Sequence, residues 1–248
     1  MNEKHKNAAH AVALMDLTTL NDTDTTQTIE QLVASIQPLL GTPAAVCVYS
    51  KFVDDAKVLL AHKGLNHVKV ATVTNFPSGD GVLSDVINET LVAIERGADE
   101  IDLVLPYKAL AAGGDAKALE YVIASKAVCP EHVKLKVIIE SGELKTHALI
   151  KQATEIAIAG GADFVKTSTG KVAINATLDA TKIILEAIKA SNKVVGFKAA
   201  GGVKTVSEAG DYLHLASDIM GADYLNPQTF RFGASSLLSQ VYNVLNEA

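Results

Sequence analysis

Short apolar, β-branched runs alternate along the chain with stretches that have the period of an amphipathic helix. The apolar runs predict strands near residues 12–17, 44–49, 68–74, 101–105, 135–140, 163–167, 194–198 and 230–234. Helical periodicity fills most of the intervals, at residues 84–96, 115–128, 145–159, 177–190 and 205–219. Strands and helices that alternate eight times are typical of a (β/α)8 TIM barrel, an α/β fold. A doubly wound open sheet is the structural alternative.

A tripeptide repeat supports repeated βα units. Gly-Ala-Asp occurs at residues 97–99, 161–163 and 221–223, each time after a helical stretch. Glycine just beyond a helix adopts a positive φ, which ends the helix. We expect the next strand to begin directly after each repeat. The start of the last strand stays open between Tyr224 and Phe230.

Length and composition favour one globular unit. The 248 residues match the ~250 residues of a single barrel, and we predict one catalytic domain over residues 1–248. Apolar residues make up 48% of the chain, enough for a large core. The net charge is −6 and no Lys/Arg run reaches five residues, which argues against nucleic-acid binding and against a basic membrane-surface protein.

Cysteine and histidine usage also narrows the function classes. The two cysteines form no CxxC motif, and neither a signal-peptide core nor an apolar stretch of ~18 residues is present, so we expect a cytoplasmic protein without a membrane span. The seven histidines lie apart without metal-ligand spacing. We expect no sequence-local zinc site, although a site assembled from distant residues stays open.

Charged residues share one face of several predicted strands. Alternate residues of a strand point to opposite faces, and the outer face of a barrel packs on helices. This parity places three acids and three lysines inside the barrel: Asp16, Asp102, Glu140, Lys136, Lys166 and Lys198. Buried charges are costly unless they are paired. A balanced set from separate strands therefore indicates a functional interior.

Lys166, Lys198 and Asp102 together favour Schiff-base chemistry. A lysine is a nucleophile only when neutral, and its usual pKa is about 10.4. Burial and a second cation lower that pKa, and Lys166 and Lys198 lie on neighbouring predicted strands. The imine of a neutral lysine is an electron sink that allows a C–C bond to break without metal. Asp102 is the candidate acid/base for the proton transfers.

Three small-residue loops after the late strands are candidate phosphate contacts. They span residues 167–171, 201–204 and 233–236. Loops seven and eight of this fold, with a helix N-terminus, commonly bind phosphate. Lys171 would supply charge, and Ser235 or Ser236 would cap the last helix. Cys47 has the inward parity of a pocket residue, although a buried core thiol is the simpler interpretation.

These residues resemble those of the deoxyribose-phosphate aldolases, class I aldolases of the (β/α)8 fold. The resemblance covers nearly the whole chain, and its most specific block is Lys-Thr-Ser-Thr-Gly at 166–170. Further matching segments are residues 14–21, 71–77, 97–102, 136–140 and 231–236. The resemblance implies a cytoplasmic lyase of deoxyribonucleotide catabolism, commonly a homodimer. It would reversibly split 2-deoxy-D-ribose 5-phosphate into D-glyceraldehyde 3-phosphate and acetaldehyde without a cofactor or metal.

The resemblance also implies a role for each matching position. Lys166 corresponds to the Schiff-base lysine, Lys198 to the lysine that tunes it, and Asp102 to the proton relay. The implied phosphate contacts are Gly170, Lys171, Gly201, Gly202, Ser235 and Ser236. The implied pocket residues are Asp16, Thr18, Cys47 and Thr169.

Two other functions remain to be separated from this one. Another class I aldolase of phosphosugars would use the same lysine chemistry with a different donor or acceptor. A barrel that binds phosphosugars without turnover would lack a use for Asp102, Lys166 and Lys198 together. The substrates expected in every case are small molecules, with no nucleic acid or membrane partner.

Overall fold

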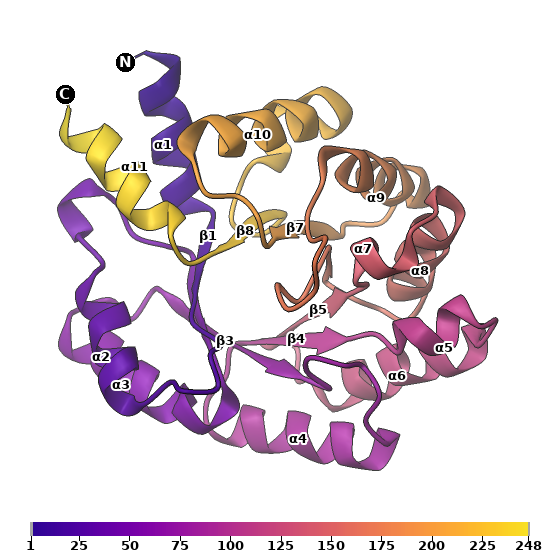
Figure 1. Ribbon diagram of the computed structural model, residues 1–248. Helices are drawn as coiled ribbons and strands as arrows, with labels where there is room; N and C mark the ends of the chain where they lie inside the picture. Colours follow the sequence, from indigo (N-terminus) through magenta and orange to yellow (C-terminus); the bar gives the residue numbers. More distant parts are fainter. Residues whose placement is uncertain (1, 248) are drawn as a thin grey trace.

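The computed structural model describes residues 2–247 and contains a closed barrel of parallel strands in sequence order. The first strand pairs with the second and with the last, so the sheet closes on itself. Helices surround this barrel (Figure 1). The (β/α)8 prediction is confirmed, and the open sheet is excluded. The strands are β1 (Met15–Thr18), β2 (Ala45–Val48), β3 (Lys69–Thr74), β4 (Glu100–Val104), β5 (Lys134–Ile138), β6 (Phe164–Lys166), β7 (Gly196–Ala200) and β8 (Phe230–Ala234).

The five helices predicted from periodicity are α4, α6, α8, α9 and α10, with ends within two residues of those expected. Threonine side chains accept hydrogen bonds from the first turns of α8, α9 and α10, which fixes where these helices begin. The helices are α1 (Glu3–Ala13), α2 (Thr26–Ala34), α3 (Val53–His62), α4 (Leu83–Glu95), α5 (Tyr107–Ala111), α6 (Asp115–Val128), α7 (Ser141–Leu144), α8 (His147–Ala159), α9 (Leu178–Ser191), α10 (Val206–Met220) and α11 (Leu237–Asn246), with short 3₁₀ turns η1 (Pro38–Leu40), η2 (Ser50–Phe52) and η3 (Ala222–Tyr224).

The predicted strand at 12–17 begins too early. Residues up to Ala13 belong to α1, and β1 starts only at Met15. Ala8, Ala11 and Val12 recur at helical spacing and are buried. α1 lies beside α10 and α11, so the first and last helices of the chain are neighbours (Figure 1).

The Gly-Ala-Asp repeat behaves as expected at two of its three positions. All three glycines have φ near +90°. β4 and β6 begin directly after the first two repeats. After Gly221 the chain forms η3 instead, and β8 begins at Phe230, which is the later of the two starts left open by the sequence. There the Tyr224 hydroxyl donates to the Val195 carbonyl, which ties η3 to the residue just before β7.

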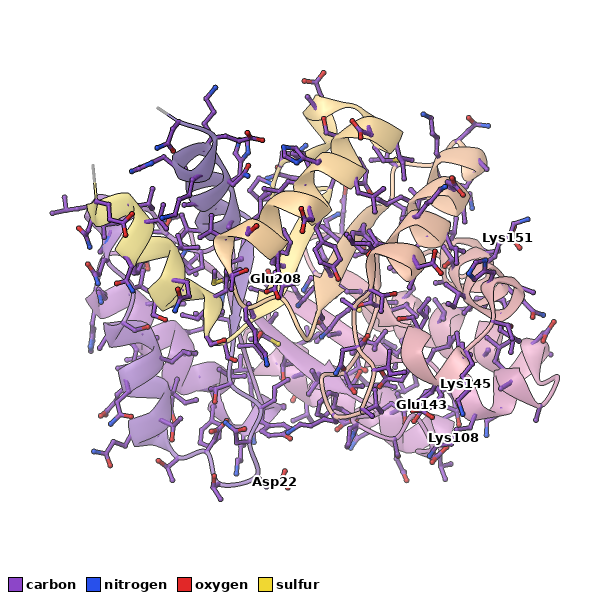
Figure 2. The ribbon with its side chains drawn as sticks, turned by 45° about the horizontal axis from the view of Figure 1, so that its top comes forward. Asp22, Lys108, Glu143, Lys145, Lys151 and Glu208 are labelled. Atoms are coloured by element: carbon purple, nitrogen blue, oxygen red, sulfur yellow. The ribbon has the colours of Figure 1, made fainter. Side chains whose placement is uncertain are left out.

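The apolar core fills the space between the barrel and its helices, as the alternation of strand residues requires. Charged side chains of the outer helices, such as Lys151 on α8, point away from the barrel (Figure 2). Within residues 2–247 no helix is long and apolar enough to cross a membrane. What remains inside the barrel is a group of charged side chains.

Candidate active site

Seven charged side chains meet in the barrel interior, and each is at most 5% exposed. They come from six of the eight strands, and several are register partners on neighbouring strands, such as Asp102 with Lys136 and Lys166 with Lys198. The group is called the ion cluster below. Its members are Asp16 (β1), Glu100 and Asp102 (β4), Lys136 (β5), Lys166 (β6), Lys198 (β7) and Arg231 (β8).

Asp102 is the centre of the ion cluster. Its Oδ2 atom accepts hydrogen bonds from Lys166 Nζ and from Lys198 Nζ, both at 2.8 Å. Its Oδ1 atom accepts a hydrogen bond from Lys136 Nζ at 2.7 Å. A proton can therefore move between Lys166 and Lys198 through a single carboxylate oxygen.

Two further carboxylates complete the ion cluster. Asp16 accepts hydrogen bonds from Lys198 Nζ and Arg231 Nη1, both at 2.5 Å. Glu100 pairs with Arg231 Nη2 at 2.8 Å and with Lys136 Nζ at 2.6 Å. Each carboxylate of the ion cluster thus has at least two cationic partners, which offsets the cost of its burial.

The parity prediction for the interior requires one correction. Glu140 is buried but lies outside the ion cluster, because β5 ends at Ile138 and Glu140 has a left-handed backbone with φ 53°. Its carboxylate instead accepts hydrogen bonds from the backbone N–H and the hydroxyl of Thr169. Burial raises the pKa of Glu140.

Sequence reasoning missed Glu100 and Arg231. Both have the inward parity of their strands, since Glu100 lies two residues before Asp102 and Arg231 lies between Phe230 and Phe232. The same alternation rule would have found them. With these two residues the ion cluster holds three carboxylates and four basic side chains, rather than the balanced set predicted.

A cavity of about 570 Å³ opens above the ion cluster at the carboxyl ends of β1, β6, β7 and β8. This is the end at which barrels of this fold carry their active sites. Lys166 is the member of the ion cluster that lines the cavity. The predicted site residues that share its wall are Thr18, Thr169, Gly170, Lys171, Gly201, Gly202 and Ser235. The wall also includes Lys204, from the predicted loop 201–204, and Asn175, which was not predicted.

Five predicted site residues are outside the cavity wall. Asp16, Asp102 and Lys198 are fully buried members of the ion cluster below it. Cys47 is also fully buried, packed with Leu20, Ala71 and Val73. Ser236 begins α11 but its side chain forms no capping hydrogen bond, so the predicted cap is not formed by this residue.

Lys166 has the electrostatics of a nucleophilic lysine. Burial lowers its pKa, because the protonated amine loses hydration. The Lys198 ammonium lowers this pKa further, while Asp102 opposes both effects. A lowered pKa increases the fraction of Lys166 that is neutral near pH 7.

The pKa values of Lys198 and Asp102 are shifted in the directions that keep both side chains charged. Burial of Lys198 is outweighed by Asp102 and Asp16, so its pKa is raised. Burial of Asp102 is likewise outweighed, by Lys136, Lys166 and Lys198, and its pKa lies well below the usual range. The two lysines that share one oxygen of Asp102 therefore have pKa values shifted in opposite directions, which is typical of an acid–base pair with divided roles.

Cys47 has no such activation. Burial raises the pKa of its thiol, so a thiolate is disfavoured. Within residues 2–247 no group of three or more His, Cys, Asp or Glu side chains has the arrangement of a metal site.

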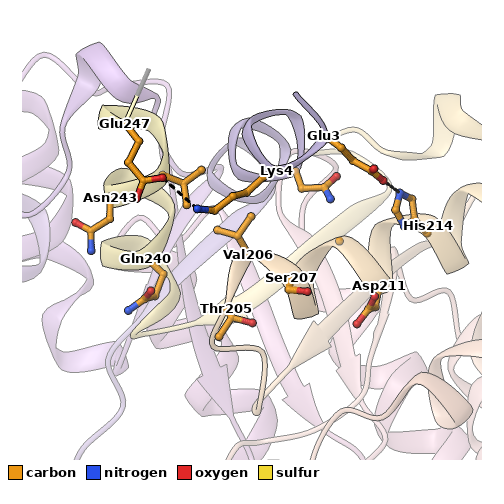
Figure 3. Close-up of a pocket in the computed structure, with 13 residues that line it drawn as sticks. Glu3, Lys4, Thr205, Val206, Ser207, Asp211, His214, Gln240, Asn243 and Glu247 are labelled. Atoms are coloured by element: carbon orange, nitrogen blue, oxygen red, sulfur yellow. Dashed lines mark hydrogen bonds and ion pairs between the residues drawn. The ribbon is translucent and has the colours of Figure 1, made fainter. Parts of the chain in front are cut away.

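A second cavity, of about 620 Å³, lies on the outer wall between α1, α10 and α11 (Figure 3). Two ion pairs border it, Glu3 with His214 at 3.0 Å and Lys4 with Glu247 at 3.1 Å. All four side chains are more than half exposed, so water screens these charges. The perturbed charges that chemistry requires are therefore in the barrel and not in this outer cavity.

Comparison with known proteins shows the family of this chain. The model of the DeoC/LacD aldolase family matches residues 10–240. The chain belongs to this family of aldolases. It is a lyase built on a TIM barrel, and the matched region includes every member of the ion cluster.

Solved structures of other proteins share the fold over nearly their whole length. The apo form of a candidate deoxyribose-phosphate aldolase from Toxoplasma gondii ME49 has 26% identity and a TM-score of 0.90, over 99% of this chain and 98% of that chain. QR15, an aldolase, has 28% identity and a TM-score of 0.77, over 96% of both chains. The tetrameric deoxyribose phosphate aldolase from Aeropyrum pernix has 19% identity and a TM-score of 0.75, over 99% and 98%. At that identity the last similarity shows the fold alone.

Proposed function

We propose that this family member is a deoxyribose-phosphate aldolase. It reversibly splits 2-deoxy-D-ribose 5-phosphate into D-glyceraldehyde 3-phosphate and acetaldehyde through a Schiff base. The observation that carries the proposal is Lys166, a lysine with a lowered pKa at the point where the ion cluster meets the cavity. The similar protein from T. gondii supports the choice of substrate.

Lys166 is the nucleophile of this reaction. Its neutral Nζ adds to the C1 aldehyde of the open-chain sugar, and loss of water from the carbinolamine leaves a protonated imine. Removal of the proton from the C3 hydroxyl then breaks the C2–C3 bond, and the electron pair moves into the imine to give an enamine. Glyceraldehyde 3-phosphate leaves, the enamine is protonated at C2, and water releases acetaldehyde and restores the amine.

Asp102 and Lys198 handle the protons of these steps. Asp102 Oδ2 lies 2.8 Å from both amines, within the reach that general acid–base catalysis requires. The raised pKa of Lys198 keeps it protonated, so its charge favours the neutral form of Lys166. Asp102 receives a proton from one partner and returns it to the other.

The phosphate of the substrate binds at the late loops of the cavity. Gly170, Gly201 and Gly202 have φ of 84°, 79° and 95°, a conformation that suits glycine and exposes backbone N–H groups. Lys171 Nζ donates to the Leu20 carbonyl at 2.5 Å and would turn toward the anion. Ser235 and Ser236 are exposed at the start of α11, where a helix N-terminus favours negative charge.

The remaining predicted residues shape the aldehyde end of the cavity. Thr18 and Thr169 form its wall, and Thr169 is held in place by Glu140. Asp16 lies below the cavity and holds Lys198 by a hydrogen bond. Cys47 also lies below the cavity and contributes apolar packing. The resemblance supports a cytoplasmic homodimer that acts in deoxyribonucleotide catabolism without a cofactor.

Purified protein tests the proposal directly. We expect cleavage of 2-deoxyribose 5-phosphate, followed by reduction of the released acetaldehyde in a coupled assay, and little turnover of fructose 1,6-bisphosphate. Preference for fructose 1,6-bisphosphate would instead assign the protein to another class I aldolase activity. No turnover of either sugar by folded protein would leave a phosphosugar-binding barrel.

A further inference from the structure

Glu100 and Arg231 are the two members of the ion cluster that face away from the proposed active site. Both line a cavity of about 610 Å³ at the opposite end of the barrel, where the chain enters the strands. Neither lines the cavity that Lys166 reaches. They are nevertheless only 3% and 5% exposed, so water screens their charges weakly on the side that faces the ion cluster.

Two chains of contacts link these residues to Lys166. Lys136 Nζ forms an ion pair with Glu100 at 2.6 Å and donates a hydrogen bond to Asp102 Oδ1 at 2.7 Å. Arg231 Nη1 and Lys198 Nζ each donate a hydrogen bond to Asp16 at 2.5 Å. Lys198 in turn donates a hydrogen bond to Asp102 Oδ2. Both chains of contacts therefore end at Asp102, the carboxylate that accepts the hydrogen bond of Lys166.

The count of charges shows what this arrangement does. Three carboxylates, Asp16, Glu100 and Asp102, face three permanent cations, Lys136, Lys198 and Arg231. This set is neutral without Lys166. A proton on Lys166 would add a fourth positive charge that no buried carboxylate balances.

The groups around Lys166 agree with this count. Asp102 faces it from β4 and Lys198 from β7, while Cys47 lies near it on β2 as a neutral thiol. Glu140, after β5, also faces Lys166 but is bonded to Thr169, and burial disfavours its charged form. Asp16 on β1 and Lys136 on β5 stand behind Asp102 and Lys198.

We propose that Glu100 and Arg231 are positioning residues that set the protonation state of Lys166, in opposite directions, by fixing the charge balance of the ion cluster from the far end of the barrel. The proposal rests on the proposed function, in which Lys166 is the nucleophile. Loss of the Glu100 charge leaves the cluster positive and drives the proton from Lys166. Loss of the Arg231 charge leaves it negative and draws a proton onto Lys166.

The test is the rate at which Lys166 itself reacts, measured against pH. Formaldehyde with cyanoborohydride methylates only neutral amines, and peptide mass spectrometry follows Lys166 alone. Relative to the parent chain, we expect the midpoint for Lys166 to fall by ~1 pH unit in Glu100→Gln and to rise by ~1 pH unit in Arg231→Met. The acid limb of kcat/KM for 2-deoxyribose 5-phosphate should move in the same two directions.

The double variant E100Q/R231M separates charge balance from structure. It removes both side chains without changing the net charge of the ion cluster, so the Lys166 midpoint should return to within ~0.3 pH unit of the parent value. This measurement remains informative even if one of the single variants folds poorly. Lys134→Gln is the matched control, because Lys134 lines the same cavity but is half exposed and outside the cluster. The Lys166 midpoint in Lys134→Gln should equal that of the parent chain.

Each result has a single meaning. A Lys166 midpoint that stays fixed in E100Q, that moves in the same direction in both single variants, or that fails to return to the parent value in the double variant would overturn the proposal and leave a structural role. If the midpoints move as expected while the parent chain fails to cleave 2-deoxyribose 5-phosphate, the charge control stands and the proposed function fails.

Discussion

At the scale of single residues, the chemistry depends on two lysines that share one carboxylate oxygen. Lys166 and Lys198 are both buried lysines on neighbouring strands, yet their pKa values shift in opposite directions. The difference comes from their partners, since Lys198 contacts both Asp16 and Asp102 whereas Lys166 contacts Asp102 alone. One lysine is therefore suited to be the nucleophile and the other to stay charged.

Removal of the second lysine should make the first more basic. In Lys198→Leu, Lys166 loses a neighbouring cation, and Asp102 is left with one partner fewer, so the pKa of Lys166 rises. The acid limb of kcat/KM should move upward by roughly one to two pH units. Lys151→Ala removes an exposed lysine on α8 and should leave the profile unchanged. An unshifted profile in Lys198→Leu would contradict the tuning role.

At the scale of elements, strand alternation predicted most of the site and strand ends explain the failures. Asp16, Asp102, Lys136, Lys166 and Lys198 all lie inward as the parity predicts. Glu140 does not follow the parity, because the chain leaves β5 two residues earlier and takes a left-handed conformation. Periodicity of apolar residues carries no signal for such an exit.

Contacts between distant residues were also beyond the sequence. The pairing of Arg231 with Glu100 joins β8 to β4 across the barrel, and strand alternation marks both residues as inward but does not show that they are partners. The predicted first strand includes the last two residues of α1, because the buried Ala11 and Val12 are followed directly by the apolar residues of β1. The barrel itself was predictable, since it depends only on the alternation of strands and helices.

The strands that carry the two lysines pack closely at one position. Gly196 on β7 pairs with Phe164 on β6, and a Cβ at position 196 would overlap the Phe164 ring. Gly196→Ala should lower the free energy of unfolding by about 1–3 kcal/mol, measured by urea denaturation. In Phe164→Leu/Gly196→Ala the smaller side chain relieves the overlap, so the two effects should not add. Simple additivity would contradict this account of the packing.

At the scale of the whole molecule, the ion cluster couples the stability of the barrel to pH. Asp16 and Asp102 have lowered pKa values in the folded state, because lysine and arginine partners outweigh their burial. The unfolded chain has the ordinary value of about 3.9. Their stabilising contribution is therefore complete above pH ~4 and is lost as pH falls toward the lowered values.

This linkage predicts a steep loss of stability in acid. The free energy of unfolding should fall below pH ~4 by up to about 3 kcal/mol per pH unit from these two groups together. Urea denaturation at a series of pH values measures it. Asp16→Asn, which removes one of the two groups, should show a shallower decline. A free energy that is unchanged from pH 6 to pH 3 would exclude charged carboxylates in the cluster.

Lys166 forms the covalent bond with substrate in the proposed reaction. Borohydride reduction of the protein mixed with 2-deoxyribose 5-phosphate, followed by peptide mass spectrometry, detects this bond. We predict a reduced adduct on Lys166, and its absence in a folded Lys166→Ala variant that has also lost turnover. An adduct on another residue, no adduct at all, or undiminished turnover by Lys166→Ala would contradict the account.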